Sequence, residues 1–371
     1  MSIEQVYTSK VKCCGCGTCM NICPKGAITM EYGEDGYRYP VINKEKCIGC
    51  GLCQKKCQYN DTSFKPTTMA DKEMDIYATQ GNKEATVRST SGGMFYLLAK
   101  SILSQNGIVY GAAYDENMVV RHIKAETMDE MEPIRCSKYV QSDVGYTYKD
   151  VKKHLEEGRN VLYSGTPCQL AGLYAYLGKD YDNLLSVGLI CYGSTPPKMF
   201  EEYVKILEEK HGSPVTFFDF RDKTDGWGNK FVRIEFEDRD KTYIVPTNDD
   251  PYRRMFSSKH FTRASCNQCP YAYMKRYTDI SIGDYWKIED TDCKINPYDG
   301  LSKVFVSTEK GRKAFEMIKS EMQWELMPYD TAVRPNLSGK GGMSPIFDEC
   351  QKDYAEHGFK YVMKKYIDAD L

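Results

Sequence analysis

Nine of the 16 cysteines lie before residue 58, and eight of them form two runs with identical spacing. The first run is Cys13-x2-Cys16-x2-Cys19-x3-Cys23, and the second is Cys47-x2-Cys50-x2-Cys53-x3-Cys57. In this spacing three thiolates from one tight loop hold a 4Fe–4S cluster, and the fourth cysteine ligates the cluster of the other run. The sequence therefore predicts two clusters, one bound by Cys13, Cys16, Cys19 and Cys57, and the other by Cys47, Cys50, Cys53 and Cys23.

Zinc is the competing metal for closely spaced cysteines, and disulfides are the competing chemistry. Zinc sites use two Cys-x2-Cys pairs separated by a longer stretch, so two complete runs of four favour iron–sulfur clusters. Disulfides are rare in intracellular chains. Cys14 is surplus to the pattern, either as a spectator thiol or as an alternate ligand. Residues 1–60 resemble a two-cluster bacterial ferredoxin, which implies electron exchange with an external donor or acceptor such as ferredoxin.

Composition narrows the function classes. Fifty basic and 52 acidic side chains give a net charge of -2, which argues against a broad basic surface for nucleic acid. No apolar run approaches the roughly 18 residues that a membrane helix needs. The first residues lack the basic-then-apolar pattern of a secretory signal. We expect a cytoplasmic protein without a membrane span, and homo-oligomerisation stays open.

The chain of 371 residues is long enough for two or three domains at roughly 100–200 residues each. Residues 61–80 are polar, contain Pro66 and show no clear period, so we expect a linker there. Beyond it, strand-like and helix-like runs alternate, which predicts an α/β body with a mixed α+β sheet over residues 81–371. We expect helices over 94–104, 149–157, 169–177, 199–210 and 312–322, and strands over 107–114, 119–125, 161–164, 184–192, 215–220, 231–236, 242–245, 280–282 and 304–306.

Four short stretches of this body combine glycine, hydroxyl or cysteine residues. Ser91-Gly92-Gly93 opens an expected helix, where free backbone N–H groups suit phosphate, although a plain capped helix start explains this motif better when it is taken alone. Gly165-Thr166-Pro167-Cys168-Gln169 and Ile190-Cys191-Tyr192-Gly193 each follow a buried strand, where α/β sheets bind ligands. The fourth stretch joins Cys266-x2-Cys269 to Asp279-Ile280-Ser281-Ile282-Gly283-Asp284.

Together these stretches resemble the coenzyme F-420 hydrogenase/dehydrogenase beta-subunit family over roughly residues 80–310, and residues 137–143 are similar to it as well. The resemblance implies a body that binds FAD. Its diphosphate would lie against Ser91, Gly92 and Gly93. The other cofactor-binding residues would be Lys138, Tyr139, Gln141, Ser142, Gly165 and Thr166.

The resemblance also implies a third 4Fe–4S cluster, held by Cys168, Cys191, Cys266 and Cys269. The Cys-x2-Cys pair has chelate spacing, which agrees with this assignment. The alternative is that Cys168 and Cys191 are buried spectators, since free cysteine is common in protein cores. Cys136, Cys293 and Cys350 then remain as plain thiols, with Cys293 as the best substitute ligand.

A ferredoxin-type cluster moves one electron whereas a hydride carries two, and flavin converts between them. The sequence therefore predicts an iron–sulfur flavoprotein oxidoreductase that exchanges hydride with coenzyme F-420 or another reducible small molecule. The candidate proton-handling residues are Asp284, His260 and Lys138, although Asp284 is equally suited to a structural role. Two alternatives remain: an electron-transfer subunit that feeds a partner enzyme, and a cluster-containing binding or sensor protein without flavin.

Overall fold

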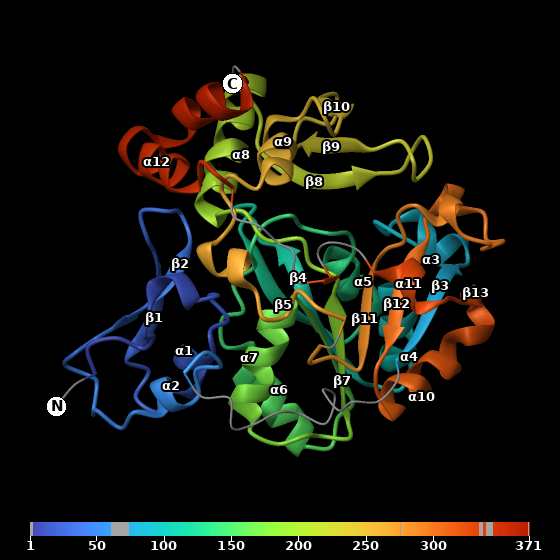
Figure 1. Cartoon of the computed structure of the whole chain (residues 1–371), viewed down its shortest axis with the longest axis horizontal. Helices are drawn as coiled ribbons and strands as arrows, with labels where there is room; N and C mark the ends of the chain where they lie inside the picture. Colours follow the sequence, from blue (N-terminus) through green and yellow to red (C-terminus); the bar gives the residue numbers. More distant parts are fainter. Residues whose placement is uncertain (1–2, 61–73, 275, 334–336, 339–343, 370) are drawn as a thin grey trace.

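The computed structural model describes residues 3–60, 74–274, 276–333, 337–338, 344–369 and 371. A small N-terminal lobe lies against one side of a larger body, and a third unit, here called the cap subdomain, lies over the end of that body (Figure 1). No helix within these described ranges combines the length and the apolar character that crossing a membrane requires.

The N-terminal lobe places its cysteine loops beside short helices. A two-stranded antiparallel ribbon pairs Ile28 with Ile42, and a glycine with positive φ precedes each helix, at φ 75° for Gly17 and 74° for Gly51. Glycine reaches this conformation without the steric penalty of a Cβ. The elements are β1 (Ile28–Tyr32), β2 (Arg38–Ile42), α1 (Thr18–Ile22) and α2 (Leu52–Lys55).

The body is built on an eight-stranded mixed sheet. Its strands are β3 (Asp75–Gly81), β4 (Ile108–Tyr114), β5 (Val120–Ala125), β6 (Val161–Gly165), β7 (Leu184–Leu189), β11 (Ile280–Asp284), β12 (Ser302–Val306) and β13 (Met322–Leu326). Their order is β13-β3-β12-β11-β7-β6-β4-β5, with β4, β6, β7 and β11 parallel and the other pairs antiparallel. The parallel strands end at one edge, which collects the loops that follow β6 and β7.

Helices cover both faces of this sheet, because successive strand residues point to opposite sides. Leu97, Leu162 and Phe315 share one apolar cluster, whereas Tyr148 and Leu170 belong to the cluster on the other face. The body helices are α3 (Lys83–Val87), α4 (Met94–Ser104), α5 (Met128–Met131), α6 (Thr147–Glu156), α7 (Pro167–Leu177), α10 (Glu309–Ile318) and α11 (Tyr329–Ala332).

The cap subdomain has a sheet and a core of its own. Three antiparallel strands in the order β10-β9-β8 pack with three helices around buried aromatic side chains such as Phe200, Phe218 and Tyr252. Its elements are α8 (Pro197–His211), β8 (Val215–Asp222), β9 (Phe231–Phe236), β10 (Thr242–Pro246), α9 (Pro251–Ser258) and α12 (Phe347–Val362). Figure 1 shows it above the strand ends of the main sheet.

The mixed α/β architecture and the N-terminal lobe confirm the expected fold class, and the helix over 94–104 is α4. The expected linker over 61–80 is too long, because Asp75–Gly81 form β3 inside the main sheet. Residues 61–73 of that segment lie outside the described residues. The expected helix over 312–322 also ends early: Ile318 closes α10, and Met322 begins β13.

Candidate iron–sulfur and cofactor site

The cysteines of the N-terminal lobe surround two separate small cavities. The cavity nearer the body is lined by Cys13, Cys16, Cys19 and Cys57, here called the inner set. The other is lined by Cys23, Cys47, Cys50 and Cys53, here called the outer set, in which Cys50 is exposed to solvent. The structure therefore groups these eight cysteines in the crossed pattern that the spacing predicts.

The loops of both sets fit a 4Fe–4S cluster by their backbone and thiol chemistry. Gly15 and Gly49, between the first two ligands of each run, have φ of 67° and 68°, so the loop can curl without a Cβ in the way. A hydrogen bond from Cys14, aided by one from Thr18, lowers the pKa of Cys16 to about 6, so this thiol ionises readily. Within the described ranges, no three His, Cys, Asp or Glu side chains are placed to hold a single metal ion.

The inner set lies directly against the body. The Thr18 hydroxyl donates a 2.8 Å hydrogen bond to the carbonyl of Gly172 in α7. A Cβ on Gly172 would lie 2.8 Å from the Cβ of Cys16 and 3.0 Å from its sulfur. The absence of a side chain at this position therefore allows the cysteine loop to approach the helix.

A third group of cysteines, here called the cavity set, lines a cavity of about 800 Å³ between the body and the cap subdomain. Its members are Cys168, Cys191, Cys266 and Cys269. Cys168 lies in the first turn of α7, which starts with a capping box at Thr166, and Cys191 lies just beyond β7. The ends of β6 and β7 therefore place Cys168 and Cys191 at the cavity, and a short 3-10 helix over Ala264–Gln268 brings Cys266 and Cys269 to the same cavity from about 100 residues further along the chain.

The remaining cysteines have other surroundings. Cys293 packs against the apolar cluster around Trp227 and is not among the cavity-lining residues, so it does not substitute for a member of the cavity set. Cys350 is buried in the cap core. Cys136 does line the cavity, and its thiol donates a 3.3 Å hydrogen bond to the carbonyl of Arg88.

Cys14 and Gln58 connect the inner set to the cavity set. Cys14 lines both the inner cavity and the large cavity. The amide of Gln58 donates to the sulfur of Cys14 at 3.3 Å and to the carbonyl of Cys168 at 2.9 Å. Hydrogen bonds to Cys16 and Cys168 raise the pKa of Cys14 well above its usual range. Cys14 is therefore a buried thiol that lies between the inner set and the cavity set.

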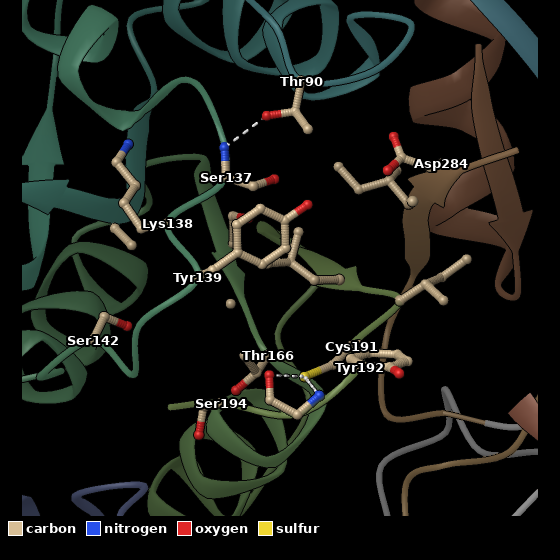
Figure 2. A pocket seen from close by; sticks show the side chains of 18 of the residues that line it. Thr90, Ser137, Lys138, Tyr139, Ser142, Thr166, Cys191, Tyr192, Ser194 and Asp284 are labelled. Carbon is tan, nitrogen blue, oxygen red and sulfur yellow. Dashed lines mark hydrogen bonds between the residues drawn. The ribbon is translucent and has the colours of Figure 1, made fainter. Parts of the chain in front are cut away.

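Most of the residues expected to contact a flavin line the large cavity (Figure 2). Gly92 is the exception, because it is packed into the sheet: its N–H donates to Ser302 Oγ at 2.9 Å, and a Cβ would lie 2.3 Å from the carbonyl of Thr79. The cavity-lining members of the expected set are Ser91, Gly93, Lys138, Tyr139, Gln141, Ser142, Gly165 and Thr166.

The three expected proton-handling residues are placed differently. The amine of Lys138 donates to the carbonyls of Pro133 and Arg135 at 2.7 and 2.6 Å, and Figure 2 shows it pointing away from the Tyr139 ring. Burial lowers its pKa to about 8. His260 is not a cavity-lining residue, and its Nδ1 lies 2.7 Å from Ser344 Oγ. Of the three, only Asp284 presents its functional group to the cavity.

Asp284 belongs to a charged group that the sequence did not reveal. Arg221, 4% exposed, donates to Asp284 Oδ2 at 2.9 Å, and its guanidinium lies 4.6 Å from the ring centre of Trp286. Arg253 stacks over the Tyr139 ring at 4.4 Å. Within the described part of the chain, Arg221 Nη2, Arg253 Nη1 and Asp284 Oδ1 are buried without a hydrogen-bond partner. These atoms are available to a bound ligand, and of the three residues only Asp284 was a candidate from the sequence.

His122 also lines the cavity, beside Ser142. Its two ring nitrogens lie 2.9 Å from the Ser164 carbonyl and 3.1 Å from Ser142 Oγ. Burial lowers its pKa to about 4. The imidazole is therefore neutral near pH 7 and positions the loop that carries Ser142.

Two family models match separate parts of the chain. Residues 158–332 match the family model for the C-terminal part of the coenzyme F420 hydrogenase/dehydrogenase beta subunit, and residues 12–60 match a 4Fe-4S dicluster domain. The F subunit of the F(420)H(2) dehydrogenase of Methanosarcina mazei is 23% identical over 366 residues, covering 95% of this chain and 93% of the relative.

A solved chain of the F420-reducing [NiFe] hydrogenase complex from Methanosarcina barkeri is also similar, with a TM-score of 0.46 and 16% identity. The alignment covers 82% of this chain and 95% of that chain. By these two matches, the chain resembles the C-terminal part of the coenzyme F420 hydrogenase/dehydrogenase beta subunit over residues 158–332 and a 4Fe-4S dicluster domain over residues 12–60.

Proposed function

We propose that this protein is an iron–sulfur electron-transfer subunit that conducts electrons between an external one-electron partner and its central cavity. The observation that carries the proposal is the succession of the three cysteine sets. The outer set lies at the surface, the inner set lies against α7, and the cavity set lines the large cavity. When bound, 4Fe–4S clusters supply one-electron steps along this succession.

The chain's own residues would hold the succession together. Gln58 bridges Cys14 of the lobe and the Cys168 carbonyl of the body, and Thr18 ties the inner loop to α7. These contacts fix the inner set relative to the cavity set. The relative from Methanosarcina mazei is one subunit of a dehydrogenase, which supports a place for this protein in a larger oxidoreductase assembly.

As a second function, we propose that the cavity binds FAD and that hydride is exchanged there with coenzyme F420 or a similar anionic acceptor. The volume of about 800 Å³ is within the roughly 300–1,000 Å³ typical of cofactor sites. The unpartnered guanidinium atoms of Arg221 and Arg253 support an anionic ligand, and the Tyr139 ring offers a stacking surface. FAD, when bound, would convert between single electrons and hydride.

One experiment tests the electron route and separates these two functions. The anaerobically purified full chain is mixed with reduced ferredoxin as a one-electron donor, and cluster reduction is followed by absorbance and EPR. We expect rapid reduction of all three clusters, and the Cys50→Ser variant, altered in the exposed outer set, should slow it. Clusters that stay oxidised, or an unaffected Cys50→Ser variant, would refute the proposed route.

The same chain is then supplied with reduced coenzyme F420 and methyl viologen. Viologen reduction by the isolated chain would establish hydride chemistry in the cavity. If reduction requires partner subunits, the chain is solely an electron-transfer subunit. His122→Gln and Arg253→Met variants give a second readout, since only the latter removes a charge that faces the acceptor.

A further inference from the structure

Arg263 is one of the largest fully buried side chains of the protein, only 1% exposed, yet its direct hydrogen bonds to oxygen go to neutral acceptors. Its Nε donates to the carbonyl of Cys13 at 2.7 Å, and its Nη2 donates to the carbonyl of Arg38 at 3.0 Å. Its Nη1 donates to the side-chain oxygen of Gln141 at 2.8 Å. Every nitrogen of the guanidinium is therefore held in place.

A buried cation needs a compensating negative charge, because its transfer out of water is costly. Arg221 has such a partner in Asp284 at 2.9 Å. No carboxylate in the described ranges forms an ion pair with Arg263. The Tyr39 ring, 4.4 Å away, offers only the weaker attraction of an aromatic face.

The closest anionic candidate is the sulfur of Cys13, 3.7 Å from Arg263 Nη2. Cys13 belongs to the inner set, and the neighbouring Gly15 has no side chain. A Cβ on Gly15 would lie 3.0 Å from Arg263 Nη1 and 2.9 Å from Gln141 Nε2. The loop is therefore built so that a guanidinium and an amide can approach the cysteines closely.

From this geometry we infer that Arg263 is the counter-charge of the cluster held by the inner set and raises its reduction potential. The one-electron reduction of this cluster, by the external donor, adds one negative charge. A fixed cation and an N–H directed at a ligand sulfur stabilise the reduced form more than the oxidised form. Because the pair is buried, solvent and salt screen this interaction little.

The position of Arg263 also links the inner set to the cavity set. Its carbonyl accepts a 2.8 Å hydrogen bond from the N–H of Cys266, a member of the cavity set. The inference rests on the proposed electron route and extends it, since it names the residue that makes the middle position of that route favourable for an electron.

The test is an EPR-monitored redox titration of the full chain, with iron content measured in the same samples. In Arg263→Met, the midpoint of the inner cluster should shift to lower potential, while the outer cluster stays unchanged. Arg38→Met is the matched control. This substitution removes a cation of the N-terminal lobe, where the inner set also lies. The charge of Arg38 is balanced by Asp143 at 3.7 Å and Glu201 at 3.5 Å.

An unchanged inner midpoint in Arg263→Met with full iron content would overturn the inference, as would an equal shift in Arg38→Met. A sample that never contains the inner cluster, even in the unmodified chain, would instead count against the electron route itself. The titration therefore distinguishes a failure of the Arg263 inference from a failure of the proposed electron route.

If Arg263→Met does not fold, the inference is tested in a variant that keeps Arg263. The Cys168→Ser variant, which lacks a ligand of the cavity set, is labelled with nitrogen-15 only in arginine. The labelled protein is reduced, and the hyperfine coupling of the label to the inner cluster is measured. We expect a resolved coupling from the guanidinium. Its absence would overturn the inference.

Discussion

Replacing Cys168 by serine tests the assignment of a third cluster to the cavity set, whose cysteines are far apart in the sequence. Four cysteines line the cavity as one set, so the loss of a ligand should remove one cluster. With about four irons per cluster, iron should fall from about twelve to about eight per chain. The N-terminal clusters should persist, because none of their eight ligands is altered.

The fold should tolerate the substitution. Cys168 Sγ lies 3.2 Å from Thr166 Oγ1, and a serine hydroxyl can take part in the same contact. The matched control is Cys293→Ser, which changes a half-buried thiol that does not line the cavity and should retain all iron. Iron and acid-labile sulfide are measured with the EPR spectrum of the reduced protein. Retention of about twelve irons in Cys168→Ser, or loss in Cys293→Ser, would refute the assignment.

Three further predictions concern pH, domain contact and ligand charge. The lowered pKa of His122, about 4, means that its contribution to stability is complete above the ordinary value of 6.5 and is lost as the pH falls. Lowering the pH from about 7 to about 5.5 should therefore cost about 1 kcal/mol of unfolding free energy, and His122→Gln should abolish that part of the loss in urea titrations. Gly172→Ala favours helix by about 1 kcal/mol but overpacks against Cys16 at a cost of about 1–3 kcal/mol. Electron transfer from the lobe to the body should slow in stopped-flow traces, and an unchanged rate would argue against the tight contact. Arg253→Met should weaken binding of reduced coenzyme F420 at least tenfold without loss of iron; equal affinity would exclude Arg253 as an anion contact.

The sequence predicted best what local geometry determines. The crossed ligand sets of the N-terminal lobe follow from cysteine spacing, because three ligands of each cluster come from one short loop. The strongly apolar strands β6 and β7 and the helix α4 were also predictable from their patterns. By contrast, β3 combines Asp75, Thr79 and Gln80 with few large apolar residues, and only its pairing between β12 and β13 makes it a strand.

The site was less predictable, because its key contacts join distant parts of the chain. Arg263 and Cys13 are separated by 250 residues, and nothing near Arg263 in the sequence identifies a buried cation. Arg221 and Asp284 come from the cap subdomain and the main sheet. Lys138 was predicted as a site residue, but its amine donates to carbonyls of its own loop instead of pointing into the cavity.

In the proposed electron route, three clusters connect the surface to the cavity. The most direct measurement is the iron, acid-labile sulfide and released flavin content of the unmodified chain after anaerobic purification. We expect about twelve irons and about twelve sulfides per chain, and FAD if the cavity also performs hydride chemistry. About eight irons or fewer would contradict the three-cluster route, because the cavity set would then hold no cluster and the route would end at the N-terminal lobe.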